Sequence, residues 1–238
     1  MTRPLTIVCL LFPGITQLDL TGPAQVFARF PDTRVHFAWH RIEPVPTDSG
    51  FAILPTVTFT EAPAADVLFV PGGQGAFELF PDADALGFVR AQASGARYTT
   101  SVCTGSFVLA AAGLLRDRRA TSHWASLAML REFGAIPTAE RVVRDGTVIT
   151  GAGVTSGVDF ALALAAELFG PDTAKRIQLG IEYDPHPPFD AGSPARPDAD
   201  PVEVAQLRRA MYDLRAPMVA AAAARLSRET AEQPRDGA

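Results

Sequence analysis

The sequence predicts an α/β fold with an open, mainly parallel sheet, helices on both faces and a small antiparallel hairpin. Short, continuously apolar runs, such as residues 5–12 and 66–70, are typical of strands covered on both faces. These runs alternate with segments of helical spacing, which indicates helical crossovers between parallel strands. Asp145-Gly146, between two further β-rich runs, is a strong signal for an antiparallel hairpin.

The predicted strands are runs of apolar, aromatic or β-branched residues bounded by turn residues. The runs on either side of the Pro/Asp/Ser-Gly turn at residues 46–50 are expected to pair as a hairpin, which the following run extends. The predicted strands are residues 5–12, 34–42, 51–53, 56–60, 66–70, 98–102, 140–144 and 147–150.

The predicted helices lie between these strands and after the last one. Thr21 is a candidate N-cap for the first helix, and Thr155 or Ser156 for a later one. Gly134 is expected to end a helix as its C-cap, and Pro217 to start, kink or split the last helix. The predicted helices are residues 24–30, 82–96, 106–112, 120–133, 155–169, 175–183 and 202–226.

Residues 1–228 are expected to form a single domain with a flavodoxin-like sheet, since no repeat or composition shift divides them. Residues 184–201 are rich in Pro, Asp and Gly, which is typical of an ordered arm or loop. Residues 229–238 are expected to be a polar, frayed C-terminal tail.

The composition indicates a soluble, cytoplasmic protein that acts on small molecules. A net charge of −5 without a basic cluster argues against nucleic acid or an anionic membrane as partner. The two cysteines cannot form a disulfide framework, which favours a reducing compartment. The short apolar run at residues 5–12 is interpreted as a strand and not as a signal peptide. The histidines lack metal-ligand spacing, so no metal is expected.

Cys103 lies where a predicted strand meets a predicted helix of small residues. A thiol at a helix start meets unpaired N–H groups and the positive end of the helix dipole, which favours its thiolate. Free cysteines are also common as small core residues, and on spacing alone both interpretations of Cys103 stay open. Cys9, within an apolar strand, is expected to be a core residue.

Two further features follow predicted strands at the same sheet edge as Cys103. Asp19 comes after the first strand, and Gly72-Gly73 after the strand at residues 66–70. Ligands bind at this carboxyl edge in open α/β sheets, so a nucleophile, an acid/base and an oxyanion site are expected together. The amides of Gly73 and Thr104 are the candidate oxyanion donors. Asp19 could instead be only a helix cap, and Gly72-Gly73 only a turn.

The motifs that carry these residues span most of the chain: LLFPG (10–14), QLDLTGP (17–23), VLFVPGG (67–73), TSVCTGS (100–106), ATSHW (120–124) and GAGVTSGVDFA (151–161). Together they resemble those of the ThiJ/PfpI superfamily, the cysteine-bearing relatives of class I glutamine amidotransferases. With residues 179–183 and 187–193 included, they are most similar to the members that hydrate isonitriles.

This resemblance implies a cofactor-free homodimer that adds water to an isonitrile to give an N-substituted formamide. It implies that Cys103 is the nucleophile, forming a thioimidate, and that Asp19 handles protons where many relatives carry Glu. Thr104 stands where protease-like and amidase-like relatives place His.

Further site residues also follow from the resemblance. Val154 and Thr155 match positions near the family nucleophile, and Tyr183 is a candidate for lining the pocket. His123 is expected to lie behind the residues that act directly.

Other functions remain open at this stage. A glyoxalase-, deglycase- or amidase-like thiol enzyme is disfavoured by Thr104, because a His base is absent there. A redox-sensing or ligand-binding module is a second alternative, since similar domains occur in transcription regulators. Nothing after Gly192 resembles a basic DNA-binding segment.

Overall fold

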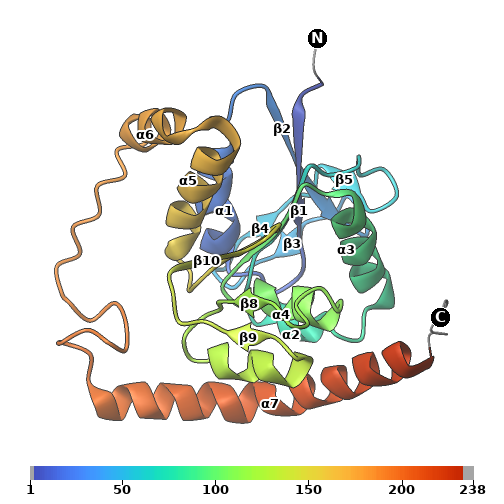
Figure 1. The fold of residues 1–238 in the computed structure, drawn as a ribbon, viewed down its shortest axis with the longest axis vertical. Helices are drawn as coiled ribbons and strands as arrows, with labels where there is room; N and C mark the ends of the chain where they lie inside the picture. The colour runs from blue at the N-terminus through green and yellow to red at the C-terminus, as the bar shows by residue number, and fades with distance from the viewer. Residues whose placement is uncertain (1–2, 233–238) are drawn as a thin grey trace.

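A seven-stranded sheet forms the centre of the computed structural model, which describes residues 3–232 (Figure 1). The strand order is β10-β11-β7-β6-β1-β2-β5, and every neighbouring pair is parallel except β10 and β11. This confirms the predicted open, mainly parallel sheet. The strands are β1 (Leu5–Leu10), β2 (Thr33–Trp39), β5 (Val57–Thr58), β6 (Val67–Val70), β7 (Tyr98–Val102), β10 (Val142–Asp145) and β11 (Val148–Gly151).

Two pairs of short strands lie outside this sheet. β3 (Val45–Pro46) and β4 (Ala52–Ile53) are antiparallel, and β8 (Arg119–Ala120) and β9 (Ile136–Pro137) are parallel. The predicted hairpin is therefore present, but its first strand is β3. The prediction that residues 34–42 belong to the hairpin, extended by residues 56–60, is wrong. Those segments form β2 and β5, which pair in parallel inside the main sheet: β2 lies beside β1, and its buried end, Ala38 and Trp39, pairs with β5.

Helices cover both faces of the sheet, as predicted. In Figure 1, α1 and α5 lie together on one side of the strands and α3 lies on the other. The long α7 passes along the lower end of the molecule, against η1, α2 and α4. The helices are α1 (Gln17–Phe27), α2 (Gly75–Glu78), α3 (Ala83–Gly95), α4 (Gly105–Ala111), α5 (Ser156–Phe169), α6 (Pro171–Gly180), α7 (Pro201–Glu232) and the 3-10 helix η1 (Leu127–Phe133).

The start of α1 differs from the prediction in a way that matters for the site. The helix begins after Thr16 and not after Thr21, so Asp19 lies in its first turn. Asp48, distant in sequence, accepts hydrogen bonds from the Gln17 amide at 3.3 Å and from the Thr16 hydroxyl at 2.7 Å. The helix end is thus satisfied by a carboxylate from the β3–β4 turn, which no local capping signal could indicate.

The C-terminal third matches the prediction in element type and differs in its bounds. α6 begins at Pro171, four residues before the predicted helix. The segment at 184–200 contains no helix or strand, as expected for the arm. Pro217 lies inside one continuous α7. The first residues of the predicted tail, 229–232, continue this helix, and residues 233–238 lie outside the described part of the chain.

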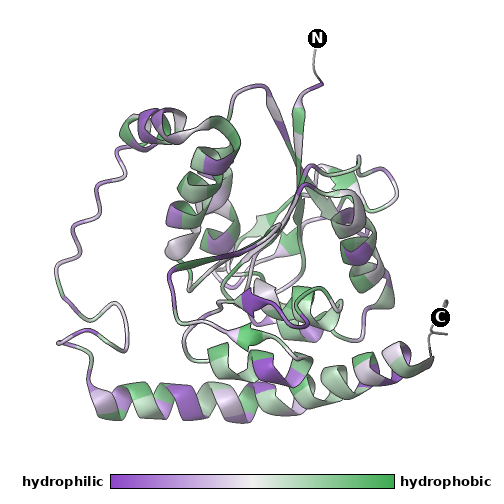
Figure 2. Ribbon diagram, in the orientation of Figure 1, coloured by the Kyte–Doolittle hydropathy of each residue, from purple (hydrophilic) through white to green (hydrophobic). Residues whose placement is uncertain are grey.

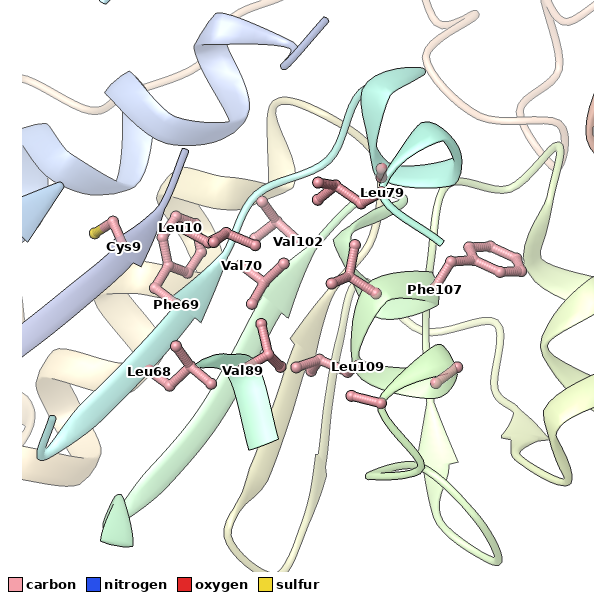
Figure 3. Packing of buried hydrophobic residues seen from close by; sticks show 14 of the residues in the cluster. Cys9, Leu10, Leu68, Phe69, Val70, Leu79, Val89, Val102, Phe107 and Leu109 are labelled. Carbon is pink, nitrogen blue, oxygen red and sulfur yellow. The ribbon is translucent and has the colours of Figure 1, made fainter. Parts of the chain in front are cut away.

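The core is built on strands whose two faces are both covered. Every residue of β6 and β7 is buried, and Cys9 of β1 is fully buried, which confirms it as a core residue. Figure 3 shows side chains of β1, β6 and β7, including Leu10, Phe69 and Val102, in one cluster with Val89 and Phe107 from the covering helices.

By contrast, α7 mixes polar and apolar residues along its length (Figure 2). None of the helices within residues 3–232 is long and apolar enough to cross a membrane.

Candidate active site

Cys103 occupies the corner between β7 and α4 in a backbone conformation that is rare for a residue with a side chain. Its φ is +53°, in the left-handed region, which costs free energy unless the surroundings hold it. Its N–H donates to the carbonyls of Gly151 at 3.1 Å and Ala152 at 2.7 Å. Its own carbonyl accepts hydrogen bonds from the hydroxyls of Ser106 at 3.1 Å and Ser122 at 2.9 Å. Four contacts thus fix the corner.

Asp19 is brought to Cys103 by the first turn of α1. Its side chain is completely buried and forms a hydrogen bond with the Cys103 thiol. One carboxyl oxygen, Oδ2, accepts the Gly72 amide at 3.0 Å, while Oδ1 has no hydrogen-bond partner among the described residues. The structure therefore places the predicted carboxyl beside the predicted nucleophile and leaves one of its buried oxygens unpaired among the described residues.

Burial raises the pKa of the Asp19 carboxyl to about 7. The hydrogen bonds from Cys103 and Gly72 oppose this rise, and the charge of Asp48 adds to it. A carboxyl with a pKa near neutrality can both accept and return a proton under physiological conditions.

The pKa of the Cys103 thiol is shifted in the direction opposite to the one expected from the sequence. Burial, and then the Asp19 charge, raise the pKa of Cys103, while hydrogen bonds from the amides of Thr104 and Val154 lower it. The prediction that the helix start alone favours the thiolate is therefore wrong, because desolvation outweighs the nearby amides. Since the two groups are hydrogen-bonded, they titrate as a pair, and nucleophile formation amounts to moving one proton from sulfur to carboxylate.

The Gly72-Gly73 turn packs directly against Cys103 and Asp19. A Cβ on Gly72 would lie 2.6 Å from Asp19 Oδ2 and 2.8 Å from Cys103 Cβ, so only glycine fits. Gly73 has a φ of +136°, which also requires glycine. The Gly73 amide donates to the Thr104 hydroxyl at 2.9 Å, and that hydroxyl donates to the Gly73 carbonyl at 2.9 Å.

The amides that reach the Cys103 sulfur therefore differ from the predicted oxyanion pair. The Gly72 and Gly73 amides are engaged by Asp19 and Thr104, whereas the amides of Thr104 and Val154 face the sulfur. The Thr104 amide is a donor to the site, as expected. The Thr104 hydroxyl also bonds the amide and the carbonyl of Gly73. Val154, which was expected near the nucleophile, contributes its backbone.

Thr155 occupies the N-cap position of α5 without a side-chain capping bond and is exposed. Tyr183 lies beyond α6, and its hydroxyl donates to Asp159 Oδ2 at 3.0 Å. The same carboxylate pairs with Arg141 at 2.5 Å. The structure thus joins Tyr183 to the surface of α5 and not to the Cys103–Asp19 pair.

His123 lies behind the loop that carries Val154. A Cβ on Gly153 would lie 2.9 Å from its Cδ2, and its Nδ1 accepts the Ala125 amide at 3.3 Å. Burial, and then the charge of Arg215, lower the pKa of His123, which keeps its ring neutral near pH 7. Within residues 3–232, no group of three or more His, Cys, Asp or Glu side chains could hold a metal ion.

Sequence reasoning missed three contributors to this site. Ser122 lies in the ATSHW motif, yet the motif does not indicate that its hydroxyl would bond the Cys103 carbonyl. Ser126 and Arg215 form a hydrogen bond of 2.7 Å behind the site. Arg215 belongs to α7, which the sequence indicates only as a packing helix, so no signal in a single sequence could find it.

The chain belongs to the DJ-1/PfpI family, whose pattern it matches over residues 5–167. It is 51% identical over 224 residues to isonitrile hydratase of Pseudomonas putida, covering 94% of this chain and 98% of that protein. A crystal structure of a ThiJ/PfpI family protein from Pseudomonas syringae superposes with a TM-score of 0.87 at 42% identity, covering 93% of this chain and 91% of that one.

A regulatory protein is also among its relatives. The HTH-type transcriptional regulator GbdR of Pseudomonas aeruginosa strain UCBPP-PA14 is 30% identical over 76% of this chain but only 52% of its own length. The comparisons confirm the family recognised in the sequence.

Proposed function

We propose that this protein is an isonitrile hydratase, which converts an isonitrile and water into an N-substituted formamide. The observation that carries the proposal is the 51% identity to the Pseudomonas putida enzyme across 94% of this chain. The buried Cys103–Asp19 pair supports it, because it provides a nucleophile and a carboxyl able to exchange a proton near neutral pH.

In the first step, the Cys103 sulfur bonds to the terminal carbon of the isonitrile. The thiol proton passes to Asp19 and from there to the same carbon, which gives a thioimidate, R–N=CH–S–Cys103. Oδ1 of Asp19 supports this role, since this buried oxygen has no hydrogen-bond partner among the described residues, while Oδ2 accepts the Gly72 amide.

In the second step, water adds to the thioimidate carbon. Asp19 takes one proton from the water and passes it to the substrate nitrogen, which gives the adduct R–NH–CH(OH)–S–Cys103. The C–S bond then breaks, the carbonyl forms, and the thiol regains its proton, so that one isonitrile and one water give one formamide. The amides of Thr104 and Val154 stabilise negative charge on the departing sulfur.

The test is to incubate the protein with an alkyl and an aryl isonitrile and to identify the formamide by mass spectrometry in heavy-oxygen water. Label in the formamide and loss of turnover in Cys103→Ser support the proposal. Unlabelled product, or full activity of the variant, contradicts it. A parallel incubation with methylglyoxal tests the glyoxalase- or deglycase-like alternative, for which the Thr104 position offers no base.

We also propose a cytoplasmic homodimer that does not bind nucleic acid. Both cysteines are free, which fits a reducing compartment, and the net charge is −5. α7 exposes Leu207 at 45% and Leu214 at 51%, which lie seven residues apart and therefore on one face of the helix, suited to contact with a second copy. Sedimentation analysis of the protein and of Leu214→Glu tests the dimer, and a monomeric wild-type protein would refute it.

A further inference from the structure

The segment that carries Ala152 and Val154 connects the Cys103 site to the start of α5. The Cys103 amide donates to the Ala152 carbonyl at 2.7 Å, and the Ala152 amide donates to the Arg141 carbonyl at 2.9 Å. The Val154 amide is hydrogen-bonded to the Cys103 sulfur. The segment is therefore bonded to both the backbone and the side chain of Cys103, and it continues directly into α5.

Asp159, in the first turn of α5, is the meeting point of two further segments. Arg141, just before β10, donates from Nε to Asp159 Oδ2 at 2.7 Å, and its Nη2 lies 2.5 Å from the same oxygen. The Tyr183 hydroxyl donates to that oxygen at 3.0 Å. Tyr183 is itself fixed at the end of α6, because its amide and its carbonyl are each hydrogen-bonded to Gln178 at 3.1 Å. One carboxylate oxygen thus joins α5 to the chain before β10 and to the end of α6, the helix beside it in Figure 1.

Arg141 belongs to both sets of contacts. Its backbone carbonyl holds Ala152, and its side chain holds Asp159. Arg141 therefore restrains the segment 152–155 at both of its ends. A shift of α5 relative to β10 would displace the Val154 amide from the sulfur, and a displacement of about 1 Å beside reacting atoms can lower a rate about a hundredfold.

A second trio of the same composition lies near the other end of α5. Glu167 accepts hydrogen bonds from the Tyr98 hydroxyl at 2.8 Å and from Arg144 of β10 at 2.6 Å. Tyr98 is the first residue of β7, whereas Cys103 follows the last residue of that strand. This trio therefore offers the same kinds of contact to α5 at the end of the sheet away from the thiol.

We propose that Arg141, Asp159 and Tyr183 are positioning residues of the Cys103 site: joined at one carboxylate oxygen, they hold α5 so that the segment 152–155 stays bonded to Cys103. The proposal rests on the proposed role of Cys103 as the nucleophile. Tyr183, expected from the sequence to line the pocket, acts on the site through α5. Partly exposed ion pairs contribute little to overall stability, so the effect of this trio is local.

The experiment compares Asp159→Ala and Tyr183→Phe with the matched controls Glu167→Ala and Tyr98→Phe. Hydrogen exchange of a proteolytic fragment that covers residues 151–156 is followed by mass spectrometry under native conditions, and kcat and KM are measured with an isonitrile. If the wild-type protein leaves isonitriles unchanged, the proposed function fails, and the exchange comparison, which needs no substrate, decides the positioning by itself.

In Asp159→Ala, the amides of the fragment are expected to exchange about tenfold faster than in the wild type, and kcat is expected to fall about tenfold with KM nearly unchanged. Tyr183→Phe removes one of the contacts and is expected to act in the same direction with a smaller effect. It also provides the comparison if Asp159→Ala does not fold. The two controls are expected to change neither measurement by more than about twofold, even where they lower the melting temperature.

Two kinds of result would overturn the proposal. The first is exchange of the fragment at the wild-type rate in Asp159→Ala, or faster exchange with an unchanged kcat. The second is an equal effect of Glu167→Ala on both measurements, which would show that the trio at Asp159 only stabilises α5 as a whole.

Discussion

Replacing Asp19 by Asn is expected to stabilise the protein at alkaline pH while removing its activity. The carboxyl is completely buried, and burial raises its pKa to about 7 from an ordinary value of 3.8. The folded protein therefore binds a proton that the unfolded chain releases between these two values. Asparagine keeps an oxygen to accept the Gly72 amide, but it carries no charge and cannot relay a proton.

The sign and size of the effect follow from this difference. Because the folded state binds more protons between pH 3.8 and about 7, wild-type stability falls as the pH rises through this window and stays low above it. The whole difference corresponds to about 4 kcal/mol, of which about 3 kcal/mol lies between about pH 5 and about pH 9. The Asp19→Asn variant does not lose this free energy of unfolding as the pH rises. For a chain of this size, its melting temperature is expected to rise by roughly 6 to 12 °C relative to the wild type across that range.

The assay is urea unfolding of wild type and Asp19→Asn at about pH 5 and about pH 9. Asp84→Asn is the matched control, since Asp84 is an exposed carboxylate in the first turn of α3. Its effect is expected to stay within about 0.5 kcal/mol at both pH values. An Asp19→Asn stability difference that is the same at both pH values would show that Asp19 is not protonated in the folded state and would refute the argument.

Three further predictions concern the same site. Gly72→Ala is expected to abolish turnover and lower the melting temperature, because its Cβ would lie 2.6 Å from both Asp19 Oδ2 and the Thr104 amide nitrogen; thermal unfolding and isonitrile loss measure this. Thr104→Val removes both 2.9 Å hydrogen bonds to Gly73 and is expected to lower the free energy of unfolding in urea by about 1 to 3 kcal/mol. An unchanged free energy of unfolding would show that the hydroxyl only fills space. The kcat/KM for isonitrile is expected to rise about tenfold per pH unit up to about pH 7, where the Asp19 carboxyl ionises, and a flat profile would argue against proton transfer to Asp19.

The convergence of Cys103, Asp19 and Gly72 could be predicted because it follows from the architecture. Each of the three comes after a strand of apolar residues, and parallel strands present their carboxyl ends at one edge. When such strands alternate with helices, the residues that follow the strands lie together at this edge. The family motifs then indicated which chemistry to expect there.

The details of the site could not be predicted, because they depend on contacts between distant segments. The first turn of α1 is capped by Asp48, 31 residues away from Gln17, so a local reading placed the helix start too late. The Gly73 amide is occupied by the Thr104 hydroxyl, which changes the expected oxyanion donors. Burial raises the pKa of the Cys103 thiol more than the facing amides lower it, and burial depends on the whole fold.

The sequence by itself determined the open, mainly parallel type of the sheet, the position of Cys103 at a strand–helix corner and the family to which the chain belongs, because these depend on local patterns of apolar, turn and motif residues. Only the tertiary structure decided the protonation of the Cys103–Asp19 pair, since desolvation and hydrogen bonding arise when remote segments pack together. It also brought Arg215 of α7 to Gln74 and Ser126. No local pattern links residues so far apart, and their proximity results from the packing of α7 against η1 and α2.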